Sequence, residues 1–336
     1  MRTSERGFSL MEITVVLAIV SVVMILVYSL IEETIQVTMF NESHNDLAIL
    51  SQSAVNSLQA EVVQTRLAFE EDATGIAYRS ALTMPTGVTV WSDSMLPIFA
   101  ASGQIEPDPA TQRFTGNSLL LARQLEPLSI TYNHDGNAST PEIEFLADRY
   151  RFEYVYLART TTKSFSDSGM SLDLMMSTSG EYADFFQLSS MGATATSRIV
   201  PKLTAAGLSR AWNPGQPLGN AFYTLAGALD GTFDGALNNP TIPVVQTKSL
   251  LRGLLGGRIS GRMYYSVAFG QFPILTPVRL FARPDPSKSG FPSGFEVKIA
   301  GPARNRQVMT RLVLMSHYGV KRYESQQAFV VTAARF

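Results

Sequence analysis

The sequence predicts an α+β protein in which a long N-terminal helix, membrane-spanning in its first part, leads into a mainly antiparallel β-sheet head. Residues 13–31 form nineteen consecutive positions without a charge. Residues 9–71 contain no Gly and no Pro, although the chain has 24 Gly and 17 Pro. From about residue 73, short apolar or alternating runs are separated by Gly, Pro, Asn and Asp, as is typical of strands and turns. A helical rod followed by a sheet-rich head accounts for all three observations.

The composition excludes several classes of protein. With 336 residues, 45% hydrophobic and 16% charged, the chain is too apolar for wholesale disorder. The absence of Cys excludes a disulfide framework, a thiolate nucleophile and a Cys-based metal site. The net charge of −1 hides a gradient: residues 1–72 carry three basic and ten acidic residues, residues 73–247 ten and fifteen, and residues 248–336 fourteen and three. The basic last part indicates an electronegative partner, such as an acidic stalk, nucleic acid or lipid headgroups.

Residues 8–31 are predicted to cross a membrane once. A helix needs about 20 apolar residues to span a hydrocarbon core of about 30 Å. A secretory signal peptide fits less well, because its apolar region is about 7 to 15 residues and ends at a small-residue cleavage site, which does not follow the span. Arg2 and Arg6 precede the span and no Lys or Arg follows it closely. The positive-inside rule therefore places residues 1–7 in the cytoplasm and the head outside.

Glu12 lies at the start of the span, where an ionised acid is costly without a cationic partner. Arg2 or Arg6 could reach it in the intact chain, because long basic side chains extend along apolar surface. A sharper alternative is a cut between Gly7 and Phe8, which would create an α-amino group four residues before Glu12, one helical turn away. The new positive charge could then pair with Glu12 within one helix or between neighbouring helices.

The run RGFSLME at residues 6–12, followed by the apolar segment, resembles the class III signal of type IV prepilins and pseudopilins. In that family a short basic leader ends in Gly, and a membrane-embedded aspartic peptidase cuts after it. Met11 is a mild departure, because Val, Ile or Leu is commoner at that position. The resemblance covers about 30 of the 336 residues and implies a pilin-like, lollipop-shaped fold.

The resemblance also assigns roles to individual residues. It implies a cytoplasmic leader that contains Arg2 and Arg6 and ends at Gly7. It implies cleavage by prepilin peptidase between Gly7 and Phe8, and N-methylation of the new Phe8 terminus. It makes Glu12 the acid that guides docking of one subunit onto another.

Residues 32–72 are predicted to continue the helix as an amphipathic stalk. A helix over residues 8–72 would be about 100 Å long at 1.5 Å per residue. Its apolar residues recur near helical spacing and form a stripe that must be buried from water, either by the head or by other subunits. Gly75 and Pro85 indicate that the helix has ended. The apolar positions are Phe40, Leu47, Leu50, Ala54, Leu58, Val62 and Leu67.

Residues 73–336 are predicted to form the β-rich head. The clearest strand, residues 149–157, places four aromatic side chains on one face and Arg149, Arg151 and Glu153 on the other. Asp135-Gly136 and Asn213-Pro214-Gly215 predict turns, and residues 204–245 predict an irregular insertion. The other predicted strands are residues 118–122, 128–132, 263–269, 278–282, 295–300, 311–316 and 328–333.

The sequence contains no catalytic motif that we recognise. The three histidines, His44, His134 and His317, form no HExxH pair, and neither a GxSxG elbow nor a GxxxxGK[ST] loop occurs. We therefore expect no enzymatic activity. A membrane-tethered enzyme of the cell envelope stays as an alternative, because catalytic triads are spatial and need no fixed spacing.

Two loops are candidates for calcium, residues 133–144 and residues 230–239. In the first, Asp135, Asn137 and Glu142 would supply oxygen ligands. Calcium takes six to eight oxygens, and neither loop has the EF-hand order. Solvated turns are the preferred explanation of both loops, so no cofactor and no other metal is expected.

The densest basic pieces of the C-terminal part are candidates for facing a ligand. They contain Arg304 and Arg306 in one piece, and Lys321 and Arg322 in the other. Solvated strand edges and loops are the ordinary explanation of such charges.

The resemblance implies a structural subunit of a type IV pilus or a type II secretion-like filament. Because the head is large, a minor pilin or minor pseudopilin, similar to the large W or J types, is favoured over a major pilin. The expected partners are prepilin peptidase, other pilin or pseudopilin subunits, the assembly platform protein of the inner membrane and membrane lipid. The chain would start in the inner membrane, then enter a pilus or a periplasmic pseudopilus. A tip adhesin or a DNA-binding minor pilin, meeting nucleic acid through the basic C-terminal part, is the main alternative.

Overall fold

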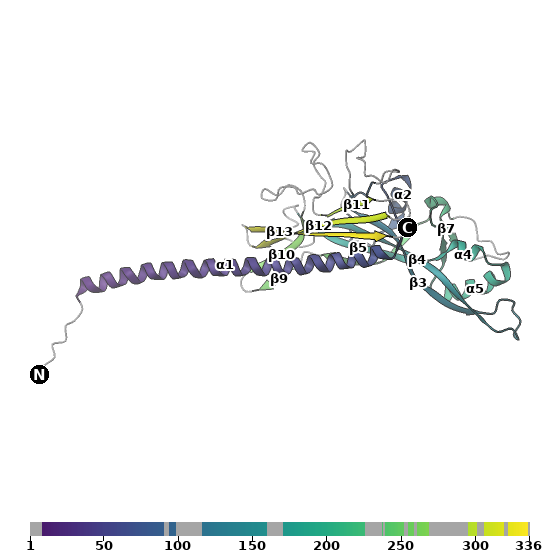
Figure 1. Cartoon of the computed structure of the whole chain (residues 1–336), viewed down its shortest axis with the longest axis horizontal. Helices are drawn as coiled ribbons and strands as arrows, with labels where there is room; N and C mark the ends of the chain where they lie inside the picture. The colour runs from purple at the N-terminus through teal and green to yellow at the C-terminus, as the bar shows by residue number, and fades with distance from the viewer. Residues whose placement is uncertain are drawn as a thin grey trace.

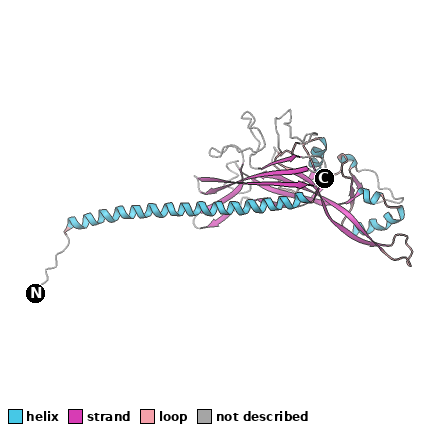
Figure 2. Cartoon of the chain, in the orientation of Figure 1, coloured by secondary structure: helices cyan, strands magenta, loops and turns pink. Residues whose placement is uncertain are grey.

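The computed structural model describes residues 9–90, 94–98, 116–159, 171–225, 237, 239–251, 255–258, 261–268, 295–300, 306–318 and 322–334. One long helix leaves a head built on a largely antiparallel sheet, and the exposed N-terminal part of the helix projects from one end (Figures 1 and 2). This confirms the predicted α+β layout of helix followed by sheet.

Helix α1 spans Leu10–Val63 and is 54 residues long. At 1.5 Å per residue it extends for about 80 Å. The prediction that the helix continues to Asp72 is wrong by nine residues, because strand β1, Thr65–Ala68, follows directly. Ala68 of β1 pairs with Leu121 of the neighbouring strand, so the sheet supplies backbone hydrogen bonds that end the helix. Asp72 starts a new helix, since its side chain accepts a hydrogen bond from the Gly75 backbone N–H at 2.7 Å.

The head contains one sheet in the strand order β1-β3-β4-β5-β10-β12-β11, with six further strands attached to this path. Most pairs are antiparallel, whereas β2 pairs with β8, and β5 with β6, in parallel. The remaining strands are β2 Leu82–Thr83, β3 Leu119–Tyr132, β4 Ile143–Arg159, β5 Ser171–Asp184, β6 Arg210–Trp212, β7 Phe222–Thr224, β8 Ile242–Leu251, β9 Leu255–Arg258, β10 Gly261–Ala268, β11 Phe295–Ala300, β12 Arg306–Tyr318 and β13 Arg322–Ala334. The short helices are α2 Ala73–Ala81, α4 Phe185–Ser189, α5 Ala193–Ala205 and η1 Leu218–Asn220.

Most of the predicted strands are present. The two predicted over residues 118–122 and 128–132 are one strand, β3, with a register shift between Leu125 and Leu128. The strand predicted over residues 278–282 lies outside the described residues. Strands β5 and β8 and the three α-helices of the head were not predicted.

The irregular insertion predicted over residues 204–245 is partly wrong. It contains β6, η1, β7 and the beginning of β8, and β6 joins the sheet beside β5. Short strands of three residues carry too little periodicity to be seen in a sequence. Both predicted turns are confirmed by positive backbone φ angles, +80° at Gly136 and +83° at Gly215.

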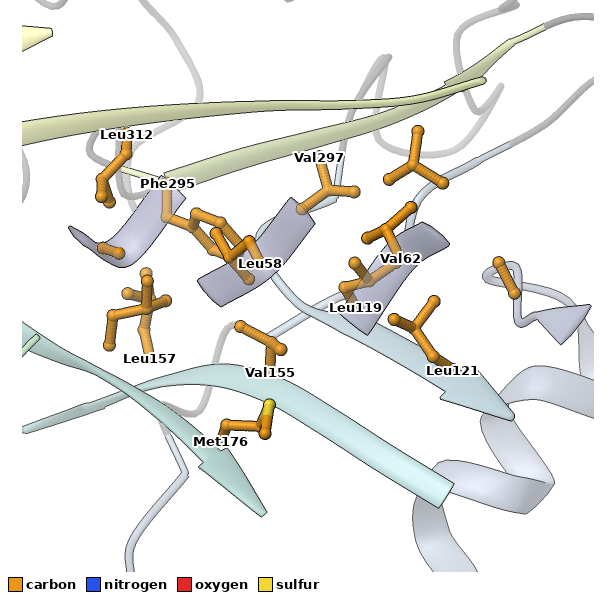
Figure 3. Packing of buried hydrophobic residues seen from close by; sticks show 14 of the residues in the cluster. Leu58, Val62, Leu119, Leu121, Val155, Leu157, Met176, Phe295, Val297 and Leu312 are labelled. Atoms are coloured by element: carbon orange, nitrogen blue, oxygen red, sulfur yellow. The ribbon is translucent and has the colours of Figure 1, made fainter. Parts of the chain in front are cut away.

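The sheet has two different buried faces. On one face, Leu58 and Val62 of α1 pack against residues of β3, β4, β5, β11 and β12 (Figure 3). On the other, Phe152 lies among aromatic side chains, including Tyr78 of α2 and Trp212 of β6. A third cluster lies at the far end of the head, where α4 and α5 cover the extended β3–β4 hairpin. Strand β4 alternates between the two faces, as its sequence predicted.

Candidate functional site

The start of α1 is the first part of the candidate site. Ser9 is the N-cap, its hydroxyl accepts from the Glu12 backbone N–H at 3.2 Å, and Glu12 Oε2 accepts from the Ser9 backbone N–H at 2.8 Å. This reciprocal capping box holds the Glu12 carboxylate back toward the N-terminal end of the helix. Arg2, Arg6, Gly7 and Phe8 lie outside the described residues.

The first half of α1 is an uncovered apolar rod. Among the described residues, α1 is the one helix long and apolar enough to cross a membrane, and its most apolar stretch is not buried by the head. Leu26, for example, is 64% exposed. The hydroxyls of Thr14 and Ser21 donate to the carbonyls of Leu10 and Leu17 at 2.8 Å. The hydroxyl hydrogens of Thr14 and Ser21 are therefore satisfied inside the helix, as a hydrocarbon environment requires.

The second half of α1 is buried by the chain itself. Ala54, Leu58 and Val62 are spaced four residues apart and lie on the helix face that meets the sheet. In Figure 3, Leu58 lies beside Phe295, and Val62 lies close to Leu119. This seam is the apolar contact that joins the head to its helix.

A cluster of charged side chains lies at the C-terminal end of the seam, and we call it the Glu61 cluster. Glu61 of α1 makes an ion pair with Arg123 of β3, with Lys248 of β8 at 3.4 Å, and with Arg151 of β4 at 4.0 Å. Glu153 of β4 pairs with Arg151 at 2.6 Å and with Arg123 at 3.3 Å. Three cations from three strands therefore surround one helix acid and one sheet acid.

Glu153 is fully buried in this cluster, with 0% of its surface exposed. Its burial raises the pKa of the carboxyl, and the negative charge of Glu61 raises it further, against the opposing effect of Arg151 and Arg123. The sequence placed Arg151 and Glu153 on the face of β4 opposite the aromatic residues, but gave no signal that α1 covers them.

The predicted calcium loop has its oxygens engaged in turn hydrogen bonds. Asp135 Oδ1 accepts from the Asn137 backbone N–H at 2.8 Å, and Asp135 Oδ2 accepts from the Thr140 hydroxyl at 2.8 Å. These bonds, the backbone one first, lower the pKa of Asp135. Glu142 makes an ion pair with Lys202 of α5 at 3.6 Å. Among the described residues, no group of three or more His, Asp or Glu side chains could hold a metal ion.

The basic residues predicted to face a ligand are only partly described. Arg304 and Lys321 lie outside the described residues, and Arg306 and Arg322 are placed by their backbone in β12 and β13. Arg306 opens β12 opposite Ala334, whereas Arg322 opens β13 opposite Tyr318. The two arginines thus lie at opposite ends of one hairpin, about 40 Å apart at 3.3 Å per residue. They do not form a single basic patch.

The described part of the head contains buried tyrosines, and an open groove runs along α1. Burial raises the pKa of Tyr78 to about 12, although the hydrogen bond from Trp212 opposes this, and burial also raises the pKa of Tyr182 to about 12. Both phenols therefore stay protonated at neutral pH. An open groove of about 630 Å³ runs along α1 and is lined by Ile49, Gln52, Ser53, Asn56, Ser57 and Ala60. These lining side chains include no acid and no base.

Comparison with known proteins adds one finding. Residues 2–28 match the family model described as the prokaryotic N-terminal methylation motif. No curated protein and no solved structure matches the chain. The motif, the capped Glu12 and the exposed apolar helix support a type IV pilin-like or pseudopilin precursor that is anchored in a membrane before assembly. The chain therefore carries at its N-terminus the class III signal of type IV pilins.

Proposed function

We propose that the chain is a minor pilin or minor pseudopilin, a structural subunit of a type IV pilus or a type II secretion-like filament. Its leader lies in the cytoplasm, its head lies outside, and prepilin peptidase cuts after Gly7. The observation that carries the proposal is the methylation motif at residues 2–28, joined to an apolar helix that its own head leaves uncovered. Such a surface is stable in lipid, or against the helices of other subunits.

Assembly is driven by packing of the apolar span against the spans of neighbouring subunits. Glu12 orients one subunit relative to the next, because its carboxylate at the start of the helix can pair with the Phe8 α-amino group of a neighbouring subunit. The positive charge made by cleavage and the negative charge of Glu12 then each reduce the free energy needed to place the other in the membrane. The work of the chain is structural, and we propose no catalytic role for the head.

Processing and docking are tested separately in the native host. The N-terminus of the mature chain should be N-methylated Phe8, measured by mass spectrometry, and Gly7→Ala should slow cleavage strongly. Glu12→Ala should leave cleavage and membrane insertion intact but remove the chain from sheared filaments. Glu32→Ala, which removes an exposed acid of the same helix, is the matched control. A mature chain that starts at Met1 would refute the proposal, and normal incorporation of Glu12→Ala would refute the docking mechanism.

A further inference from the structure

The chain contains three Asn-x-Ser/Thr triplets, the pattern that accepts a sugar on an Asn side chain. They lie at residues 41–43, 137–139 and 239–241. The third has Pro240 in its middle position, which the pattern excludes. Two triplets therefore remain, and the structure places them in different surroundings.

Asn41 lies inside helix α1, which runs without interruption from Leu10 to Val63. The backbone N–H of Ser43 is bonded within the helix to the carbonyl four residues earlier, so the Asn41 side chain cannot use it as a partner. Sugars are attached at this pattern in surface loops of exported chains. Asn41 therefore fits the pattern in sequence but not in conformation.

Asn137 lies in the turn between β3 and β4, at the end of the head opposite the N-terminal part of α1 (Figure 1). Residues 134–139 are all exposed. The Asn137 Oδ1 atom accepts a hydrogen bond from the Ser139 backbone N–H at 3.0 Å, which closes an Asx turn. Within the described residues, neither Asn137 Nδ2 nor the Ser139 hydroxyl has a hydrogen-bond partner. Both groups of the acceptor pattern are thus open to an enzyme.

The conformation of this turn is fixed by bonds between near neighbours. Asp135 accepts from the Asn137 backbone N–H at 2.8 Å and from the Thr140 hydroxyl at 2.8 Å. The Asn137 carbonyl accepts from the Thr140 backbone N–H at 2.9 Å and from Asn133 Nδ2 at 2.5 Å. All these bonds lie within residues 133–140, so the turn needs no contact with the rest of the head. A segment ordered in advance loses less entropy when an enzyme binds it.

Exposed apolar side chains lie close to the turn. Ile143, the first residue of β4, is 42% exposed, and Leu146 is 53% exposed. They pair with Tyr132 and Ser129 in the outer part of the β3–β4 hairpin. A bulky, hydrated sugar on Asn137 would hinder these side chains from meeting the apolar surface of another chain.

We propose that Asn137 is an N-glycosylation site. The donor is a sugar whose anomeric carbon carries a diphosphate, linked either to a polyprenyl lipid or to a nucleoside. The reaction forms a bond between Asn137 Nδ2 and the anomeric carbon, and it breaks the bond from that carbon to a diphosphate oxygen. The diphosphate leaves with the bonding electrons, and one proton passes from Nδ2 to a base of the transferase. With the lipid-linked donor the reaction rests on the proposed export of the head, whereas the nucleotide-linked donor acts before export.

Mass spectrometry of the full chain purified from its native host tests the site. We expect a sugar on the peptide that contains Asn137, placed on that residue by fragmentation. Asn137→Gln and Ser139→Ala should each remove the sugar, and Ser139→Thr should retain it, because Thr also completes the pattern. Asn41→Gln is the matched control and should leave the sugar in place. The unfolding transition of each variant, followed by Trp212 fluorescence, checks that the head still folds.

A second measurement identifies the donor. The chain is made in a host without such transferases and is placed in neutral micelles. It is then incubated with washed membranes of the native host, or with the soluble extract of that host and added uridine-diphosphate sugars. Transfer by the membranes assigns the lipid-linked donor, and transfer by the soluble extract alone assigns the nucleotide-linked donor.

Three results would overturn the site. An unmodified Asn137 in a chain that begins with N-methylated Phe8 would reject the site and leave the proposed function intact. A sugar that persists in Asn137→Gln and is lost in Ser139→Ala would place the sugar on the serine oxygen. A sugar on Asn41 in place of Asn137 would show that the turn does not select the acceptor. Conversely, a sugar on Asn137 of a mature chain that starts at Met1 would support the site and reject the proposed function.

Discussion

The two halves of α1 are built from similar apolar residues but have opposite environments. Leu26 in the first half is 64% exposed, whereas Leu58 in the second half is 2% exposed. The helix is continuous between them, so its local conformation does not explain the difference. The second half is covered by the sheet of its own chain, and the first half depends on lipid or on other subunits. One helix thus combines an intramolecular interface with an apolar surface that its own chain leaves uncovered.

The largest expected effect is a difference between the two halves of α1 in how much an alanine substitution lowers the free energy of unfolding. Leu58→Ala removes a side chain packed against the sheet and should lower the free energy of unfolding by about 2 to 5 kcal/mol. Leu26→Ala should change it by less than about 0.5 kcal/mol, because no head residue covers that position. Denaturant titration of the full chain in micelles, followed by the fluorescence of the buried Trp212, measures both. Equal losses of unfolding free energy for Leu58→Ala and Leu26→Ala would mean that the sheet does not stabilise the second half of α1 more than the first.

A smaller effect on the free energy of unfolding is expected at the Glu61 cluster, which lies at the C-terminal end of the seam. Glu61→Gln leaves Arg123, Arg151 and Lys248 without their shared helix acid, and hydrogen bonds to charged groups contribute about 1.5 to 3 kcal/mol. Since Lys248 is partly exposed, we expect a loss of about 1 to 2 kcal/mol in the same titration. Glu32→Gln is the control, because Glu32 lies on the exposed half. A neutral Glu61→Gln would show that apolar packing alone fixes α1 on the head.

The smallest expected effect is a dependence of the free energy of unfolding on pH, caused by Glu153. Its pKa is raised in the folded chain, chiefly by burial, above the value of about 4.3 of an unfolded glutamate. The folded state therefore binds the proton more tightly. The stabilisation of the folded state by proton binding at Glu153 is complete below about pH 4.3, and it is lost as the pH rises through the folded pKa.

Glu153→Gln cannot titrate and should remove this component from the pH profile of stability. The measurement is the difference between wild-type and variant unfolding free energies across the acidic range. Glu181→Gln, which removes a more exposed carboxylate from the neighbouring strand, should leave the component in place. A wild-type profile with the opposite slope would mean that the two arginines outweigh burial.

The sequence predicted the features whose signal is local. The methylation motif, the apolar span, the alternation of β4 and the Asp135-Gly136 turn each depend on a short run of residues. The end of α1 was mispredicted because Thr65–Ala68 has no strand signal of its own and becomes a strand only by pairing with β3. Residues of low β periodicity in β5 and β8 were missed for the same reason.

The amino-acid sequence alone determined that this chain has one apolar span, an acid at its start and a sheet-rich head, because charge, hydropathy and period are properties of neighbouring residues. Only the tertiary structure decided which apolar residues of α1 are covered, and it surrounded Glu61 with cations from three separate strands. Such contacts join residues up to 187 positions apart. Their formation depends on strand register and helix packing, which no local pattern specifies.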